Sequence, residues 1–134
     1  MRSLQGERGS ASVLILGLSV AVLVGVGFAV DATRKGQAYS QATSIAEEAA
    51  RAGDQALKTR ELAAGTDADV DPQLAVAEAQ RYLTASGASG TARWADGRLI
   101  VETTITRPTV FLGSIGVSEF TVHGTGAAVA VSAG

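Results

Sequence analysis

The stretch that decides the fold is ASVLILGLSVAVLVGVGFAV, residues 11–30, which carries no charged side chain. Arg8 and Asp31 are the nearest charged residues on its two sides. At a rise of about 1.5 Å per residue, a helix of this length spans roughly 30 Å, the thickness of a bilayer's hydrocarbon core. In lipid the backbone must satisfy its own hydrogen bonds, so the segment is expected to be helical despite its Val and Gly residues. The sequence therefore predicts a chain that is anchored in a membrane or exported through one.

A cleavable signal peptide is the alternative interpretation of this run. Arg2 and Arg8 supply a basic start, and Val30-Asp31-Ala32 supplies a small-residue cleavage site. The apolar part of a signal peptide is usually only about 7–15 residues long, so the length of this run favours an uncleaved anchor. We expect a single-pass protein of the cell membrane, with a cytoplasmic tail of residues 1–10 and an extracytoplasmic domain of residues 31–134.

Composition excludes several classes of function. The 134 residues carry a net charge of −2 with both signs interspersed, so no basic face is available for a nucleic acid. Aromatic residues make up only 4%, which argues against a large ligand pocket. The chain contains no cysteine, so a small exported domain must depend on helix packing or on assembly rather than on disulfides.

After the span, small residues recur at alternating spacings of four and three, which predicts a seam on one helical face. These residues are Ala38, Ala42, Ile45, Ala49, Ala52, Ala56, Thr59 and Ala63. The pattern extends the helix to about residue 64, with Gly65 ending it and a possible bend at residues 31–36. The seam can pack on the chain's own second helix and sheet, which we favour, or on a neighbouring subunit.

The remaining sequence predicts a short helix and a small sheet. Asp71-Pro72 begins a second helix that stops at Gly87, with Val76, Ala79 and Leu83 on one face. A hairpin turns at Asp96-Gly97, and its second strand, 98–106, places Leu99, Val101 and Ile105 on a buried face. Residues 109–118 form an apolar connection to a last strand over 120–131, in which Gly124 and Gly126 leave room for a close helix. The predicted fold is α+β with a three-stranded antiparallel sheet.

Four segments together carry a resemblance to a known family. They are Arg8-Gly9-Ser10 before the span, Ala29-Val30-Asp31 at its end, the Gln- and Ala-rich helix of residues 41–53, and PTVFL at 108–112. In this order they resemble the TadE/TadG-like proteins of the bacterial Flp (tight adherence) pilus machinery. The resemblance implies a pilin-like, membrane-anchored, non-enzymatic component of pilus assembly or secretion at the cell surface. Its implied partners are the membrane and other pilus or secretion subunits, including pilins.

One position departs from the pattern of pilin-type relatives, which are processed after a glycine that a glutamate follows at the fifth position. Counted from Gly9, that position is Leu14. The departure leaves processing at Gly9 open and places the chain nearer the TadG-like accessory proteins than the major pilins. An assembly factor and a minor pilin both remain possible.

Small residues also repeat every four positions within the span, at Gly17, Ala21, Gly25 and Ala29. Such a face lets transmembrane helices approach each other closely. Together with Ala42, Ile45, Ala49 and Ala52 of the alanine seam, these residues form the predicted helix-packing interface.

No motif for catalysis or cofactor binding is evident. Residues 67–71 (DADVD) resemble the start of a calcium loop, but Pro72 stands where such a loop needs glycine, so we expect no metal there. His123, the only histidine, has no Cys or acidic partner at motif spacing. We therefore expect no catalytic residue, cofactor, metal or small-molecule substrate. The alternative function is an extracytoplasmic ligand-binding module, exported or anchored, that uses the acidic loop or the sheet face and has no pilus role.

Overall fold

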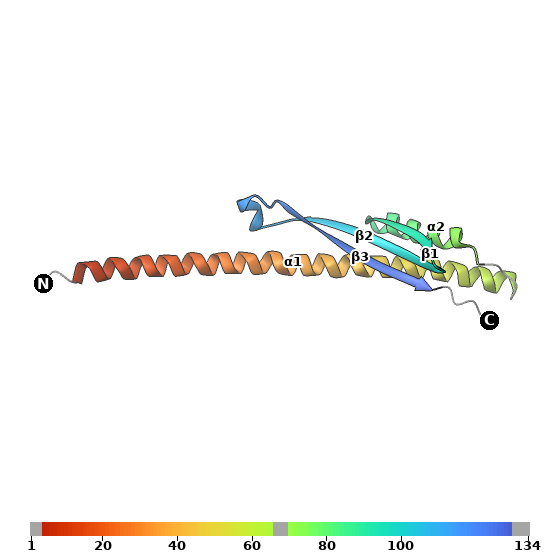
Figure 1. Cartoon of the computed structure of the whole chain (residues 1–134), viewed down its shortest axis with the longest axis horizontal. Coiled ribbons are helices and arrows are strands. Elements are labelled where there is room, and N and C mark those ends of the chain that lie inside the picture. The colour runs from red at the N-terminus through yellow and green to blue at the C-terminus, as the bar shows by residue number, and fades with distance from the viewer. Residues whose placement is uncertain (1–3, 66–69, 130–134) are drawn as a thin grey trace. The chain divides into compact units, whose positions relative to one another are not determined.

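The computed structural model describes residues 4–65 and 70–129 of the chain. Their elements are α1 (Leu4–Ala64), α2 (Pro72–Ser86), β1 (Ser89–Ala95), β2 (Arg98–Pro108), the 3-10 helix η1 (Leu112–Ile115) and β3 (Glu119–Val129) (Figure 1). The predicted α+β class, with a long first helix, a short second helix and a three-stranded sheet, is confirmed.

The chain divides into two compact units. The first unit contains Met1–Arg34 and Pro108–Glu119, and the second contains Lys35–Arg107 and Phe120–Gly134. α1 contributes to both, and its helical hydrogen bonding is unbroken through residues 31–36, where the sequence allowed a bend.

The ends of both helices are set by the residues that the sequence singled out. α1 ends at Ala64, and Gly65 follows in the left-handed conformation with a φ of +84°. Asp71 caps α2 by accepting hydrogen bonds from the amides of Gln73 (3.1 Å) and Leu74 (3.4 Å), and Pro72 follows at the first helical position. Gly87, with a φ of +70°, closes α2. The predicted caps are therefore confirmed.

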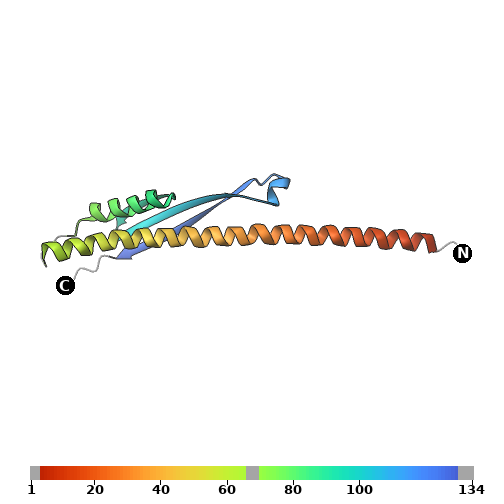
Figure 2. The ribbon, with the colours of Figure 1, turned by 180° about the vertical axis from the view of Figure 1, so that it is seen from behind.

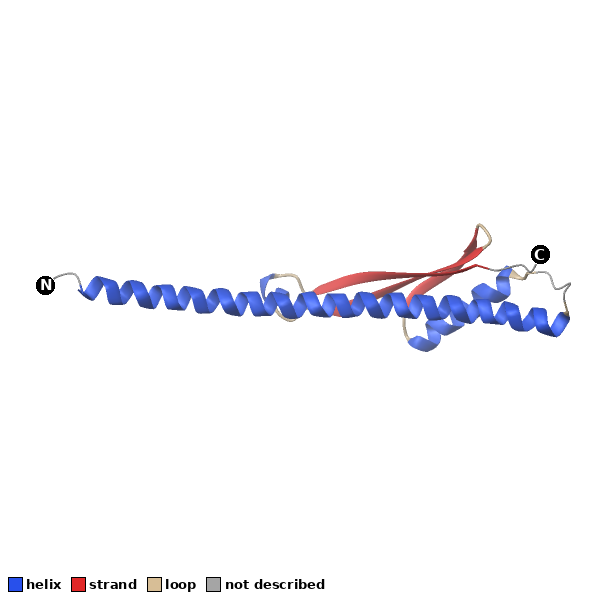
Figure 3. Ribbon diagram, turned by 90° about the horizontal axis from the view of Figure 1, so that it is seen from below, coloured by secondary structure: helices blue, strands red, loops and turns tan. Residues whose placement is uncertain are grey.

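The sheet has the order β1-β2-β3, and its strands are drawn in red in Figure 3. Ala95 pairs with Arg98 across a two-residue turn, Asp96-Gly97, whose φ values of +50° and +72° match the predicted type I′ turn. Side chains of β2 meet those of β3 with chain directions opposed: Thr104 with His123, and Thr106 with Thr121. All three strands are thus antiparallel.

The core of the second unit lies between the inner face of the sheet and the two helices (Figure 2). Alternate residues of β2 are buried, as predicted for Leu99, Val101 and Ile105, and Thr103 joins them. α2 contributes Ala75, Ala79 and Leu83. Val76, expected on this face, is only half-buried, and Ala75 takes its place. The side chain of Gln80 bonds to the backbone of β1 at Gly90 and Ala92, which joins α2 to that strand.

The buried face of α1 departs from the predicted alanine seam after Ala49. Thr59 and Ala63 are exposed, and Ala52 and Ala56 are only half-buried. The buried positions are instead Ala38, Ala42, Ala46, Ala49, Ala50, Gly53 and Leu57. The prediction assumed the 3.5-residue repeat of a coiled coil, whereas a straight α-helix has 3.6 residues per turn and drifts about 20° per heptad from that repeat. The seam was therefore wrong in its second half.

Glycines bring backbones into direct contact in this core, as the sequence predicted for β3. A Cβ atom on Gly124 would collide with the backbone of Ala42, and one on Gly126 would collide with the backbone of Ala46. At the first of these contacts, the hydroxyl of Thr103 donates a 2.6 Å hydrogen bond to the carbonyl oxygen of Ala42. Helix and sheet therefore meet at backbone distance, with few side-chain atoms between them.

Candidate functional site

The first unit contains the apolar half of α1. Among the described residues, one helix is long and apolar enough to cross a membrane, and none of its most apolar window is buried. Of residues 11–30, only Gly27 is even half-buried, and large side chains such as Leu14, Leu18 and Leu23 are well exposed. An exposed apolar surface of this extent is stable in lipid rather than in water, so the helix indicates a single membrane anchor.

The small-residue face of the span, Gly17, Ala21, Gly25 and Ala29, is exposed along its whole length. A Cβ atom placed on Gly17 or Gly25 would meet nothing within 4 Å. Nothing in the described chain covers this face, and its role in helix packing stays a prediction.

The four predicted interface residues after the span lie in the second unit. Ala42 and Ala49 are fully buried, and Ile45 and Ala52 are half-buried. Ala49 belongs to the larger core cluster, and Ala42 packs in a second cluster with Ile105 and Val122. The chain's own sheet and helix thus occupy the positions that the sequence offered either to them or to a neighbouring subunit.

Asp31 is a structural site that the sequence analysis did not identify. It is only 4% exposed, and its carboxylate accepts hydrogen bonds from the backbone amides of Val110 (2.8 Å), Phe111 (3.0 Å) and Leu112 (2.9 Å). These N–H donors, with a further contribution from the positive charge of Arg34, hold the pKa of Asp31 below its usual value. The carboxylate therefore fixes the start of the connection between β2 and β3 to the end of the span.

Gly27 provides a second contact one turn before Asp31. The ring of Phe111 lies over Gly27, where a Cβ atom would collide with it. Both segments were visible in the sequence as a carboxylate just after the span and an apolar run at 109–118. Neither segment contains a local pattern that predicts a contact with the other, some 80 residues away, so the site can be identified only in the folded structure.

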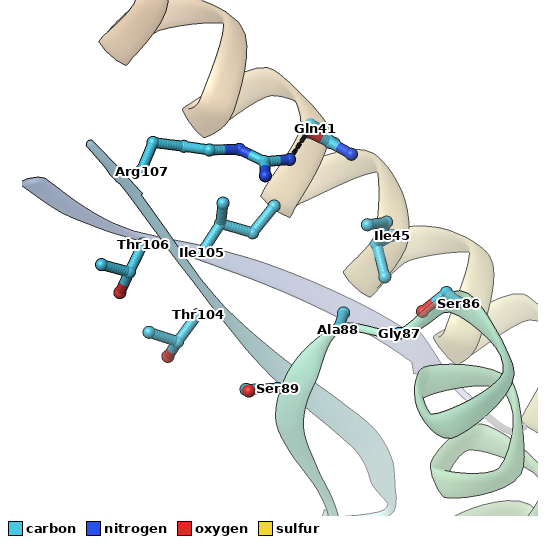
Figure 4. Close-up of a pocket in the computed structure, with 10 residues that line it drawn as sticks. All are labelled: Gln41, Ile45, Ser86, Gly87, Ala88, Ser89, Thr104, Ile105, Thr106 and Arg107. Carbon is cyan, nitrogen blue, oxygen red and sulfur yellow. Dashed lines mark hydrogen bonds between the residues drawn. The ribbon is translucent and has the colours of Figure 1, made fainter. Parts of the chain in front are cut away.

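The second unit has an open hollow between α1, the turn from α2 to β1, and β2 (Figure 4). Its volume is about 340 Å³, and Arg107 is its one charged lining residue. The Arg107 guanidinium donates to Oε1 of Gln41 at 3.2 Å. On the outer face of the sheet, Nδ1 of His123 lies 3.2 Å from the hydroxyl of Thr104.

The acidic loop can be only partly described, because Asp67 and Asp69 lie outside the described residues. Asp71 is engaged within the fold: besides capping α2, its Oδ2 accepts a 2.6 Å hydrogen bond from Arg60. That bond and the capping amides lower the pKa of Asp71. Within residues 4–65 and 70–129, no group of three His, Cys, Asp or Glu residues could hold a metal ion.

The anchor and the fold define a class: an α+β protein whose first helix carries one candidate membrane span. Residues 9–69 match the family model described as putative Flp pilus-assembly TadE/G-like, so this segment is similar to that family, in agreement with the resemblance seen in the sequence. The match covers a little under half of the chain and includes the span and most of α1. Proteins described as TadE/G-like pilus-assembly proteins are generally non-enzymatic. No curated protein and no solved structure matches the chain.

Proposed function

We propose that this chain is a non-enzymatic, membrane-anchored component of Flp/Tad-type pilus assembly or secretion. The observation that carries the proposal is the family match over residues 9–69, which includes the whole span. The N-terminus lies in the cytoplasm, and residues 31–134 form the extracytoplasmic domain. A folded unit that begins at Lys35 follows the span, as expected of an extracytoplasmic domain.

The contacts of Asp31 and Gly27 support an uncleaved anchor over a signal peptide. Cleavage after Ala32 would remove both residues from the mature chain. Val110, Phe111 and Leu112 would then lose the acceptor of their backbone amides. A cleaved signal peptide would no longer be present to supply this carboxylate to the folded protein.

In this proposal the span acts by packing against a helix of another subunit through Gly17, Ala21, Gly25 and Ala29. The hydrophobic effect does not drive helix association in lipid, so close packing must do so, and small residues permit it. The geometry of the first unit supports this choice of face. Gly27 lies two positions from both Gly25 and Ala29, which places Phe111 on roughly the opposite side of the helix. The small-residue face is therefore not used by the chain's own loop.

The test is crosslinking in native membranes, with a photoreactive residue in place of Leu18, beside the small-residue face. Gly25→Ile should insert normally and resist carbonate extraction, yet lose the crosslinked product, because its side chain holds the helices apart. Leu23→Ile, a volume-conserving change away from that face, is the control and should crosslink like the wild type. Equal crosslinking in both variants would contradict packing through this face.

The pilus role is tested separately by deleting the gene and complementing it. Deletion should abolish surface pili or the secretion that depends on them, and the wild-type gene should restore them. Complementation with Gly25→Ile should fail and with Leu23→Ile should succeed. Normal pili in the deletion strain would overturn the assembly role.

A further inference from the structure

The connection between β2 and β3, residues 109–118, has an unusual surface for a loop outside a core. Its sequence, TVFLGSIGVS, contains no charged residue. Val110, Ile115 and Val117 are 57%, 67% and 48% exposed. Along the sequence, the nearest charged residues are Arg107 and Glu119, on the two flanks of the loop. A cluster of exposed apolar side chains marks a surface that something other than water covers.

The position of this loop indicates what covers it. Asp31 accepts hydrogen bonds from the amides of Val110 and Phe111, and the ring of Phe111 packs on Gly27, which belongs to the apolar span. Four residues of helix separate Gly27 from Asp31, about 6 Å along the axis. An apolar element that lies in a membrane interface is buried about 5–10 Å into the boundary between headgroups and acyl chains. The loop is thus fixed at the depth where the span leaves the hydrocarbon.

Seven of the ten backbone amides of the loop donate to acceptors within the chain, as a lipid environment favours. The amides of Val110, Phe111 and Leu112 donate to Asp31. The remaining bonds are Thr109 to Ser118 (3.0 Å), Ser114 to Phe111 (3.1 Å), Gly116 to Gly113 (3.3 Å) and Val117 to Leu112 (3.0 Å), each from an amide to a carbonyl oxygen. These bonds leave the apolar side chains as the outer surface of the loop.

We propose that residues 109–118 insert their apolar side chains into the lipid interface on the side of the membrane where Asp31 lies. The proposal rests on the membrane anchor proposed above. Lipid is the occupant because the loop contacts, at Gly27, a span whose own surface is apolar and exposed. The inserted loop gives the helix a second contact with the membrane, on one side, and this contact limits the rotation and tilt of the helix. It therefore sets the direction in which the small-residue face points (Gly17, Ala21, Gly25 and Ala29).

The experiment uses the full chain, which has no native cysteine, so that single cysteines can be labelled cleanly. Ile115→Cys carries an environment-sensitive fluorophore in vesicles of phosphatidylcholine, with and without lipids that bear a quencher at a shallow acyl position. Leu16→Cys in the span and Thr125→Cys on the outer face of the sheet are matched controls. The protein is reconstituted alone, so quenching reports lipid and not a partner subunit.

We expect a blue-shifted emission and loss of fluorescence with quencher lipid at residues 115 and 16, and neither effect at residue 125. Quenching at residue 16 without quenching at 115 would overturn loop insertion and leave the anchor intact; a partner protein would then be the occupant of this surface. Quenching at neither residue 16 nor 115 would overturn both the anchor and the loop proposal. Quenching at residue 125 as strong as at 115 would also overturn the proposal, because contact with lipid would not be specific to the loop.

Discussion

Small residues serve two different purposes in the two units. In the second unit, Gly124 and Gly126 of β3 lie against the backbone of Ala42 and Ala46, with no room for a methyl group. In the span, Gly17 and Gly25 have open space where a methyl group would stand. Both regions place glycine and alanine side by side on one face, yet the chain itself covers one set and, among the described residues, leaves the other uncovered.

The surroundings of each region explain the difference. In water, burial of apolar surface drives the sheet onto α1, and glycine and alanine let the backbones approach until Thr103 can bond to the carbonyl of Ala42. In lipid the surroundings are as apolar as the helix, so small residues bury themselves only where a partner of fitting shape exists. The same substitution should therefore have opposite consequences in the two units.

The largest expected effect is that of Gly124→Ala. The added methyl group would collide with the backbone of Ala42, which cannot move without displacing α1, so we expect a loss of about 3 kcal/mol or more in the free energy of unfolding. Chemical denaturation of the full chain in detergent measures it. Thr125→Ala, at the exposed neighbouring position, is the control and should stay within about 0.5 kcal/mol of wild type. Equal stability of both variants would show that helix and sheet are not in backbone contact.

Ala49→Leu should have the next largest effect. Ala49 is fully buried against the core, and overpacking there costs about 1–3 kcal/mol. Ala52→Leu is the matched comparison, because Ala52 lies on the same helix and is only half-buried. We expect it to cost less than Ala49→Leu in the same denaturation experiment. An equal cost at both positions would favour the coiled-coil seam of the sequence analysis over the buried face in the structure.

The comparison also shows which parts of the fold are predictable from the sequence. The caps at Asp71 and Gly87 and the turn at Asp96-Gly97 are local, so short segments suffice to predict them. The alanine seam was right as far as Ala49 and then failed, because the repeat of a helix depends on what it packs against. Asp31 was missed for a related reason, since its partners lie some 80 residues away. Periodicity predicts that a face is buried, but it does not identify a long-range partner.

Asp31→Asn should open the loop without unfolding the second unit. Asparagine keeps one acceptor oxygen but presents an NH2 group in place of the second, so the amides of Val110, Phe111 and Leu112 lose part of their acceptor. We expect those three amides to lose protection from hydrogen exchange, while the amide of Val101 in β2 keeps its protection. Asp54→Asn, which removes only an exposed pair with Lys58, is the control and should leave the loop protected.

The Asp31 carboxylate also predicts that the stability of the loop depends on pH. Because folding lowers the pKa of Asp31, its stabilisation of the loop is complete above the unfolded value of about 3.9 and is lost as the pH falls through the lower folded value. The NMR resonances of the Val110, Phe111 and Leu112 amides should therefore stay constant from neutral pH to about 4 and shift only below it. The same shifts in Asp31→Asn would assign the titration to another group.

The smallest expected effect is that of Gly25→Ala, the same substitution as Gly124→Ala in the other unit. The new methyl group meets nothing within 4 Å, and alanine favours helix over glycine, so the free energy of unfolding should stay within about 0.5 kcal/mol of wild type. The effect should appear only between molecules, as weaker crosslinking from residue 18 than the wild type shows. Gly17→Ala changes the same face two turns away. We expect the same small change in the free energy of unfolding and the same weaker crosslinking. If Gly25→Ala destabilised the isolated chain as Gly124→Ala does, the span would pack on the chain's own elements and its small residues would not be left for another subunit.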